Sequence, residues 1–275
     1  MNKGRAVITG IGVVSPIGIG LQDFWENLLA GKSGIDKITL FDASTFPTQI
    51  AAEVKDFVPE KYLTKRQSKY FSRATQFAGA AYRMAEADAE ILNIDPDRTD
   101  VVVGSTLSSF NVIEDQIYKS PSHGLSYEEG TVDPLGMLKA IISASASAIA
   151  LMAHAEGYVT TVSSACTSAL NAVGLAAQRI QEGKSDVVIT GGIDTPITRL
   201  IIGALSAANF MVTKNEDPKH ALCPFDLRRT KHALGEGAAV FIIEDMDHAL
   251  ARQAKIYCEV KDFAQGTENV NELFM

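Results

Sequence analysis

Two stretches of the chain, residues 141–153 and 165–177, consist of small and apolar residues and carry almost no charge. Their length and composition favour helices, and a helix without a charged face has to be buried rather than lie against water. A layered architecture, in which helices are sandwiched between sheets, would bury both. This demand constrains the fold more than any other feature of the sequence.

Strand-like and helical segments alternate along the rest of the chain. This alternation indicates an α/β fold with a largely parallel sheet that is covered on both faces. The first strand is expected to end in a glycine-rich turn, and the last two strands are expected to pair with each other. The predicted strands are 6–9, 100–104, 158–162, 186–190, 237–243 and 255–261, and the predicted helices are 21–30, 73–90, 137–155, 165–177 and 200–208.

Cys166 is the best candidate for a nucleophile in the sequence. It follows the β-branched run 158–162 and stands at the start of the helix predicted from Ala165. Backbone N–H groups at a helix N-terminus favour the thiolate, which is the reactive form of a cysteine. An isolated cysteine is also among the most buried residue types and often serves as a small apolar side chain. The residues alone leave a catalytic and a structural role both open.

Composition argues against several other classes of protein. With 275 residues, 46% hydrophobic content and a net charge of -8, the chain is an ordinary globular composition without a basic excess for nucleic-acid binding. Its three cysteines, Cys166, Cys223 and Cys258, are far apart, so we expect neither a disulfide framework nor a zinc site, and a reducing cytoplasm is the expected compartment. The histidines show no metal-ligand spacing. They are His123, His154, His220, His232 and His248.

The N-terminal segment is expected to hold neither a cofactor site nor a leader peptide. Gly10 and Gly12 follow a strand, but the third glycine of a dinucleotide fingerprint is absent because Ser15 stands there. The apolar run 6–19 is broken by glycines and by Pro16, unlike the core of a signal peptide. No segment reaches the roughly 20 uninterrupted apolar residues that a membrane helix needs, so no membrane contact is expected.

Five motifs, in order along the chain, carry a resemblance to a known family. They are 6–18 (Ala-Val-Ile-Thr-Gly-Ile-Gly-Val-Val-Ser-Pro-Ile-Gly), 163–169 (Ser-Ser-Ala-Cys-Thr-Ser-Ala), 190–192 (Thr-Gly-Gly), 224–226 (Pro-Phe-Asp) and 235–238 (Gly-Glu-Gly-Ala). In this succession the chain resembles the β-ketoacyl-acyl-carrier-protein synthases, which are condensing enzymes of the thiolase fold. The resemblance covers the whole chain and implies a thiolase-like layered α-β-α-β-α architecture.

The resemblance implies that Cys166 accepts an acyl chain from a carrier-protein thioester. A malonyl carrier thioester then loses carbon dioxide, and the resulting carbanion attacks the acyl-cysteine to give a 3-oxoacyl product in fatty acid or polyketide synthesis. This chemistry needs a nucleophile, an oxyanion hole and groups that stabilise the enolate. The implied partner is an acyl carrier protein, and no cofactor or metal is implied.

The sequence departs from the family pattern in its histidines. In the family, two histidines stabilise the enolate from His-x-Thr-Gly-Thr and Gly-His-x-x-Gly-Ala motifs of the C-terminal half, and no histidine here lies in such a motif. The second oxyanion-hole N–H comes from the same half. We expect an N-terminal ketosynthase half, 1–254, and a truncated start of the C-terminal half, 255–275, so that the fold is incomplete in this chain. Such a fold would leave the apolar helix after Cys166 exposed on one side, which predicts a longer protein or a partner chain.

The resemblance also implies two groups of binding residues. A basic cluster falls where the family receives the acidic carrier protein, although a solvated helix start would show the same charges. Two leucines align with positions that line the family's acyl pocket, although ordinary core packing is the alternative for both. The basic residues are Lys65, Arg66, Lys69 and Arg73, and the leucines are Leu107 and Leu205.

Three functions remain open. The first is a condensing enzyme that uses Cys166 and needs a histidine-bearing half. The second is a noncatalytic subunit, similar to the chain-length-determining partners of polyketide synthase dimers, which typically lack the nucleophilic cysteine. The third is an inactive, truncated ketosynthase. The family dimerises through the region around 134–155 and the strand before Cys166, so we expect a homodimer or a heterodimer with a completing ketosynthase chain.

Overall fold

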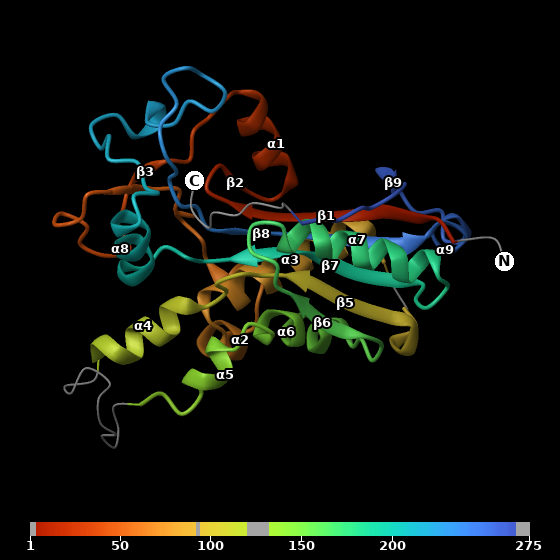
Figure 1. The fold of residues 1–275 in the computed structure, drawn as a ribbon. Coiled ribbons are helices and arrows are strands. Elements are labelled where there is room, and N and C mark those ends of the chain that lie inside the picture. The colour runs from red at the N-terminus through yellow and green to blue at the C-terminus, as the bar shows by residue number, and fades with distance from the viewer. Residues whose placement is uncertain (1–3, 92–93, 120–131, 268–275) are drawn as a thin grey trace.

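A mixed β-sheet with helices on both faces forms the body of the molecule (Figure 1). The computed structural model describes residues 4–91, 94–119 and 132–267. Within them, the strand order is β2-β1-β8-β7-β5-β6, and β9 lies beside β1. The strands of this sheet are β1 (Ala6–Ser15), β2 (Gly18–Ile19), β5 (Thr99–Gly104), β6 (Val159–Val162), β7 (Val187–Asp194), β8 (Gly237–Asp245) and β9 (Cys258–Val260), and β3 (Asp36–Lys37) pairs with β4 (Ile50–Ala51) in a separate small sheet.

Two helices, α3 and α6, cover one face of the sheet, and α7 covers the other. The helix α3 packs against β1 and β8, and α6 packs against α3 and β5, whereas α7 covers the opposite face over β5 and β7. The α-helices are α1 (Leu21–Leu29), α2 (Lys65–Tyr70), α3 (Arg73–Ala89), α4 (Phe110–Lys119), α5 (Gly136–Ala140), α6 (Ala144–Ala153), α7 (Ser168–Gln181), α8 (Arg199–Ala207) and α9 (Met246–Ala251), and short 3-10 turns span Pro59–Lys61, Pro96–Arg98 and Pro218–His220.

The prediction of a largely parallel sheet was wrong. Among the strands of the described residues, the parallel pairs are β5 with β6 and β5 with β7, while β8 runs antiparallel to both β7 and β1. The last two strands do not pair with each other, since each pairs with β1 instead, with Ala6 opposite both Asp245 and Val260. The reason is that α9 lies between them in the chain and carries β9 across to the far side of β1.

The first strand extends beyond the predicted end at residue 9. β1 runs to Ser15, because its glycines serve helix packing rather than a turn. A Cβ on Gly10 would lie 2.3 Å from the carbonyl oxygen of Ala85, and a Cβ on Gly12 would lie 1.9 Å from that of Ala81. Both carbonyls belong to α3, so the two glycines allow this helix to lie directly on the strand.

The charge-free segments form helices that each bury one side. The segment predicted as one helix over 137–155 is two, α5 and α6, because Ile141 takes an extended conformation between them. In α6, Ile149 is fully buried while Leu151 is 78% exposed, and in α7, Ala172 is fully buried while Leu170 is 71% exposed. Seven of the ten residues of α6 and six of the fourteen residues of α7 are buried, so the expectation of burial is largely met in α6 and only in part in α7.

The segment after α9 lies on the same body as the rest of the chain. β9 joins the sheet, and further on Phe263 packs against Gly174 of α7. Residues 268–275 of the predicted second segment lie outside the described residues. Among the helices of the described ranges, none has the length and apolar character to cross a membrane.

Candidate active site

Cys166 lies in a tight turn between the end of β6 and the start of α7. The helix begins at Ser168, with Thr167 as its N-cap residue, so Cys166 precedes the helix and is not part of its first turn as predicted. The cause is Ala165, whose φ of 53° is in the left-handed region, which non-glycine residues rarely adopt and which no right-handed helix can contain. The turn presents the Cys166 side chain to solvent.

Side-chain hydrogen bonds hold this turn. Ser168 Oγ donates to the carbonyl oxygen of Ala165 at 2.6 Å and accepts from the Ser164 N–H at 2.9 Å. From the neighbouring turn after β5, Thr106 Oγ1 donates to the same Ala165 oxygen at 2.8 Å. Asn171 Nδ2 donates to Ser164 Oγ at 2.7 Å. The backbone on both sides of Cys166 is therefore fixed by polar side chains.

An open pocket of about 320 Å³ lies beside Cys166 and is lined by the ends of β5, β7 and β8 and the first turns of α7. Two glycines bring these elements together. A Cβ on Gly104 would lie 2.3 Å from the carbonyl of Ser168, and a Cβ on Gly192 would lie 2.4 Å from the Cβ of Ala169. Only glycine at both positions lets α7 start directly above the strand ends, which places Cys166 at the carboxyl edge of the parallel strands.

Asp194 is the residue of this pocket that sequence reasoning missed. It is the last residue of β7, and its Oδ1 accepts from Ser105 Oγ at 3.0 Å and from the Leu107 and Ser108 N–H groups at 2.8 and 2.6 Å. The Thr106 N–H lies 3.1 and 3.0 Å from its two carboxylate oxygens. The sequence signal was available, because an aspartate follows the Gly191-Gly192 motif at the carboxyl end of a strand, where sites of α/β sheets gather.

The predicted basic residues divide into an exposed group and one residue that is half-buried. Lys65, Arg66 and Lys69 are exposed on α2, and no ion pair within the described part of the chain engages them. Arg73 is different, because its Nε and Nη2 donate to the Glu236 carboxylate at 2.8 and 2.5 Å and Nη2 also donates to the Val54 carbonyl. Arg73 thus differs from the three basic residues on α2, because its guanidinium is only partly exposed and is held by Glu236 and Val54.

The two predicted acyl-pocket leucines lie apart from the Cys166 pocket lining. Leu107 is half-buried in the turn after β5, one residue from Thr106, which does line the pocket. Leu205 packs from α8 on a cluster that contains Phe41, Ile202 and Met211. The structure therefore does not bring the two leucines together around Cys166.

No histidine lines the Cys166 pocket among the residues that the structure describes. His154 ends α6, His220 pairs with Asp217, His232 is exposed, and His248 Nδ1 donates to the Glu244 carboxylate at 2.7 Å. His123 lies outside the described residues. The described residues also contain no group of histidine, cysteine and carboxylate side chains that could hold a metal ion. Cys166 thus has a pocket and a fixed backbone but no described general base.

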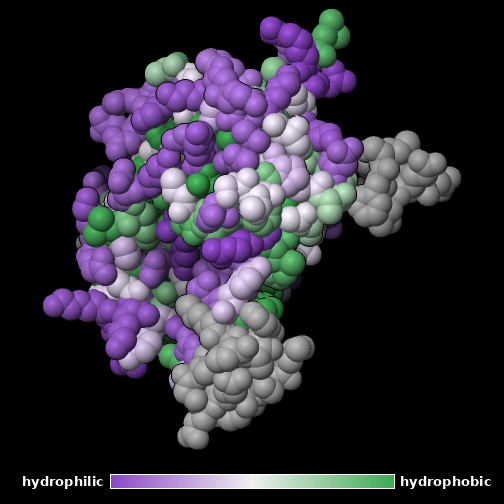
Figure 2. All heavy atoms as spheres, turned by 90° about the vertical axis from the view of Figure 1, so that its left-hand side faces the viewer, coloured by the Kyte–Doolittle hydropathy of each residue, from purple (hydrophilic) through white to green (hydrophobic). Residues whose placement is uncertain are grey.

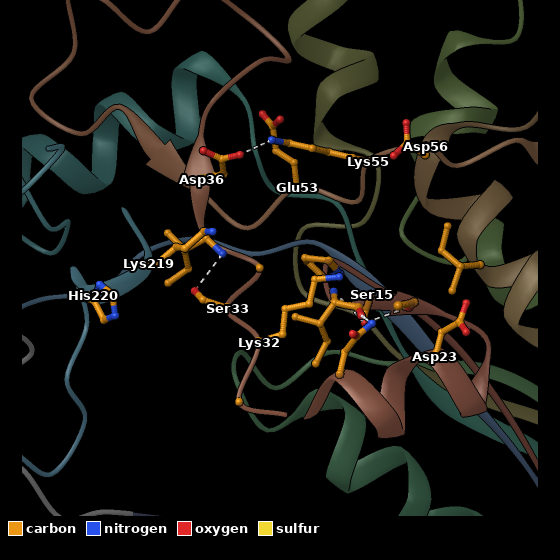
Figure 3. Close-up of a pocket in the computed structure, with 18 residues that line it drawn as sticks. Ser15, Asp23, Lys32, Ser33, Asp36, Glu53, Lys55, Asp56, Lys219 and His220 are labelled. Carbon is orange, nitrogen blue, oxygen red and sulfur yellow. Dashed lines mark hydrogen bonds and ion pairs between the residues drawn. The ribbon is translucent and has the colours of Figure 1, made fainter. Parts of the chain in front are cut away.

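A second, larger pocket of about 720 Å³ lies between the β1–β2 turn, α1 and the hairpin of β3 and β4 (Figure 3). Its lining mixes both charges, with Lys32 and Lys219 opposite carboxylates such as Asp36, which pairs with Lys55 at 2.6 Å. It shares no lining residue with the Cys166 pocket. Figure 2 views the side of the molecule where α8 and β3 lie, and hydrophilic residues dominate that face, with smaller groups of hydrophobic ones between them.

Comparisons with known proteins agree on one family. The family model described as "Beta-ketoacyl synthase, N-terminal domain" matches residues 3–249. The chain is 38% identical over 265 residues to 3-oxoacyl-[acyl-carrier-protein] synthase 2 of Coxiella burnetii, a match that covers 96% of this chain and 63% of that protein. It is also 38% identical over 270 residues to the actinorhodin polyketide putative beta-ketoacyl synthase 1 of Streptomyces coelicolor, covering 95% of this chain and 57% of that protein.

Solved structures give the same answer for the fold. The ishigamide ketosynthase/chain length factor superposes with a TM-score of 0.85 at 30% identity, covering 94% of this chain and 63% of that one. A type II polyketide synthase acyl-carrier protein in complex with its ketosynthase bound to the hexaketide superposes with a TM-score of 0.82 at 28% identity, covering 94% and 62%. The α/β, thiolase-like fold expected from the motifs is confirmed, and the chain spans about three fifths of the length of these relatives.

Proposed function

Since this chain belongs to the β-ketoacyl synthase family, we propose that it supplies the acyl-accepting half of a condensing enzyme that acts on carrier-protein thioesters in fatty acid or polyketide synthesis. One observation carries the proposal: Cys166 is exposed on a fixed turn beside an open pocket at the carboxyl edge of the parallel strands. A cysteine that served only as a core side chain would be buried.

The first step is transfer of an acyl group to Cys166. The Cys166 thiolate attacks the carbonyl carbon of the incoming thioester and forms a tetrahedral oxyanion. The oxyanion collapses, the bond to the carrier's sulfur breaks, and that sulfur leaves as a thiolate that takes up the proton given up by Cys166. The product is an acyl thioester on Cys166 and a free carrier thiol, so the step needs no redox reagent.

The second step is the condensation itself. A malonyl carrier thioester loses carbon dioxide, and the resulting carbanion attacks the carbonyl carbon of the acyl-Cys166. The carbon–sulfur bond breaks, Cys166 returns as a thiolate, and the 3-oxoacyl chain stays on the second carrier. The enolate of this step needs donors beside it, and none of the described histidines lines the pocket. We assign that role to a histidine-bearing half, on a longer polypeptide or on a partner chain, beyond an N-terminal half of 1–254 and the short segment 255–275.

The carrier protein is the proposed macromolecular partner. The exposed charges of Lys65, Arg66 and Lys69, which no ion pair with another described residue engages, form one basic edge along α2 on a chain whose net charge is -8. Such a local reversal of charge favours encounter with an acidic protein. A solved ketosynthase structure contains its acyl-carrier protein, which supports a partner of this kind.

Assembly and substrate selection complete the proposal. The chain is proposed to form a homodimer, or a heterodimer with a completing ketosynthase chain, and the ketosynthase/chain length factor among the solved structures supports the heterodimer. Leu107 and Leu205 are proposed to shape the acyl site once the remainder of the protein is present. A chain-length-factor role without catalysis is the weaker alternative, because Cys166 stands at the nucleophile position of the motif.

The test is acylation of Cys166 by an acyl-carrier thioester. The full chain is incubated with the thioester, and intact mass followed by peptide mapping locates the acyl group. We expect one acyl group, on Cys166, lost in Cys166→Ala and retained in Cys258→Ser, which removes another exposed cysteine. Acylation that persists in Cys166→Ala, or that never occurs in the presence of all parts of the enzyme, would contradict the proposal.

A further inference from the structure

We propose that Asp194 is a positioning residue for Cys166, because it shapes the turn after β5 so that Thr106 holds the backbone immediately before the nucleophile. This inference rests on the proposed role of Cys166 as the acyl acceptor. It assigns a function to a carboxylate that lies in the same pocket as the thiol but cannot act as its proton acceptor without giving up the contacts described next.

The Asp194 carboxylate is the common hydrogen-bond acceptor of the turn 105–108. It accepts from three consecutive backbone N–H groups, those of residues 106, 107 and 108, and from the hydroxyl of Ser105. Hydrogen bonds to an ionised carboxylate are stronger than those between neutral groups. Without this acceptor, consecutive N–H groups in a half-buried turn would have no partner, and the turn would not keep its shape.

A second contact ties the same turn to the residue after Asp194. Thr195 donates to the carbonyl oxygen of Ser108 from its N–H at 3.3 Å and from its Oγ1 at 2.9 Å. Ser108 has a φ of 41°, so the turn contains its own left-handed residue. Asp194 thus accepts from the N–H groups of the turn, and Thr195 donates to its Ser108 carbonyl. Together these bonds fix the position of Thr106.

Thr106 connects this turn to the residue before the nucleophile. Its Oγ1 donates to the Ala165 oxygen at 2.8 Å and lies 3.2 Å from Ser168 Oγ, which contacts the same oxygen. The carbonyl of Ala165 and the N–H of Cys166 belong to one planar peptide unit. Holding that oxygen therefore fixes the direction of the Cys166 N–H, which is a donor suited to the oxyanion that forms on the thioester carbonyl oxygen when the Cys166 sulfur attacks the carbonyl carbon.

The experiment compares two reactions of Cys166 in the full chain. One is acyl transfer from the carrier thioester, which requires an oriented sulfur and N–H, and the other is alkylation by iodoacetamide, which requires only an accessible thiolate. The variants are Asp194→Ala, Asp194→Asn, which keeps the Oδ1 acceptor, and Thr106→Val, which removes only the hydroxyl. The matched control is Glu53→Gln. Glu53 is a buried carboxylate that, like the half-buried Asp194, accepts from consecutive backbone N–H groups and a hydroxyl, but it lies outside the Cys166 pocket.

We expect Asp194→Ala to slow acyl transfer by about 100-fold and Thr106→Val by about tenfold, since a misplacement of roughly 1 Å has effects of this size. Alkylation should change little, Asp194→Asn should restore most of the acyl transfer, and Glu53→Gln should leave it unchanged. This split between two reactions of one sulfur would not arise from general loss of stability, which alters both.

Two results would overturn the inference while leaving the proposed function intact. One is normal acyl transfer in Thr106→Val and Asp194→Ala when the unsubstituted chain is acylated on Cys166. The other is an equal fall of both reactions, which would make the role of Asp194 structural. If Asp194→Ala does not fold, Thr106→Val decides. If the unsubstituted Cys166 accepts no acyl group from the carrier, the proposed function fails first and this inference with it.

Discussion

The ring of Phe263 lies directly on the backbone of Gly174, where a Cβ would come within 2.2 Å of two ring carbons. This contact docks the segment after β9 on α7, close to the helix face that carries the exposed Leu170. In an isolated helix, alanine at position 174 would be more stable than glycine by about 1 kcal/mol. Glycine is required here because a Cβ would overlap the Phe263 ring.

Gly174→Ala is therefore expected to displace Phe263 and loosen the segment 258–267. Overpacking costs about 1–3 kcal/mol, which outweighs the gain in helix propensity. Limited proteolysis should show faster cleavage in that segment. The control is Gly203→Ala in α8, where the nearest atom to a new Cβ is 3.5 Å away and only the stabilising propensity effect should remain. Equal stabilisation by both substitutions would contradict this account.

Glu244 is expected to make the protein less stable in acid. Burial raises the pKa of this carboxyl, but hydrogen bonds from Arg252, Thr9 and His248 outweigh burial and hold its pKa below the ordinary value of 4.5. A carboxyl whose folded pKa is depressed stabilises the fold above its unfolded pKa and loses that contribution as the pH falls. Glu244→Gln should thus flatten the loss of stability below about pH 5 and lower stability at pH 7 by about 3 kcal/mol. Urea unfolding between pH 3 and pH 7 measures both effects. If the free energy of unfolding of Glu244→Gln falls with acid as steeply as that of the unsubstituted protein, Glu244 is not the cause.

Arg73 should matter for stability and not for carrier binding. Its partner Glu236 has a side chain that is 1% exposed, and Arg73→Met would leave that carboxylate buried without its cation. Removing one member of a buried pair typically costs about 3–5 kcal/mol. We expect a loss of this size in denaturant unfolding, with the affinity for the carrier unchanged in the fraction that stays folded. A carrier-binding defect without a stability loss would restore Arg73 to the basic face.

Charge reversal on α2 should weaken carrier binding and leave the stability of the fold unchanged. Lys65→Glu combined with Lys69→Glu removes two exposed cations and adds two anions without breaking any described ion pair. Binding of an acidic carrier should weaken by about tenfold at low salt, and the difference should shrink as salt screens the charges. Titration at several salt concentrations tests this, with Lys214→Glu as a control at an exposed lysine outside α2. Unchanged affinity at low salt would remove α2 from the docking surface.

Much of the fold could be predicted from local patterns, because strand and helix periodicities are properties of short segments. The buried strand at β5 and the long helix α3 were predicted at nearly their observed bounds. Pairing could not be predicted in the same way. Whether β8 neighbours β9 or β1 depends on contacts between segments far apart in sequence, and the glycines at 10 and 12 mark helix contact or a turn with equal ease.

The site was predictable where chemistry is carried by one residue type and not where it depends on geometry. The position of Cys166 after a β-branched strand was correct, but the left-handed Ala165, which delays the helix to Ser168, leaves no mark in the sequence. Asp194 was missed because its importance comes from donors on another strand's turn. Arg73 looked like its basic neighbours until its buried partner, Glu236, was seen.

The placement of β1 has a consequence for synthesis. This strand is the first strand of the described chain to be made, yet its long partner β8 and the neighbouring β9 are the last two. At roughly 5–20 residues per second, the wait is on the order of tens of seconds. Throughout that time Val7, which is fully buried in the finished fold, lacks its pairing partners on β8 and β9. The sheet can close around β1 only after β8 has been made, and an apolar strand without its partners is prone to aggregate until then.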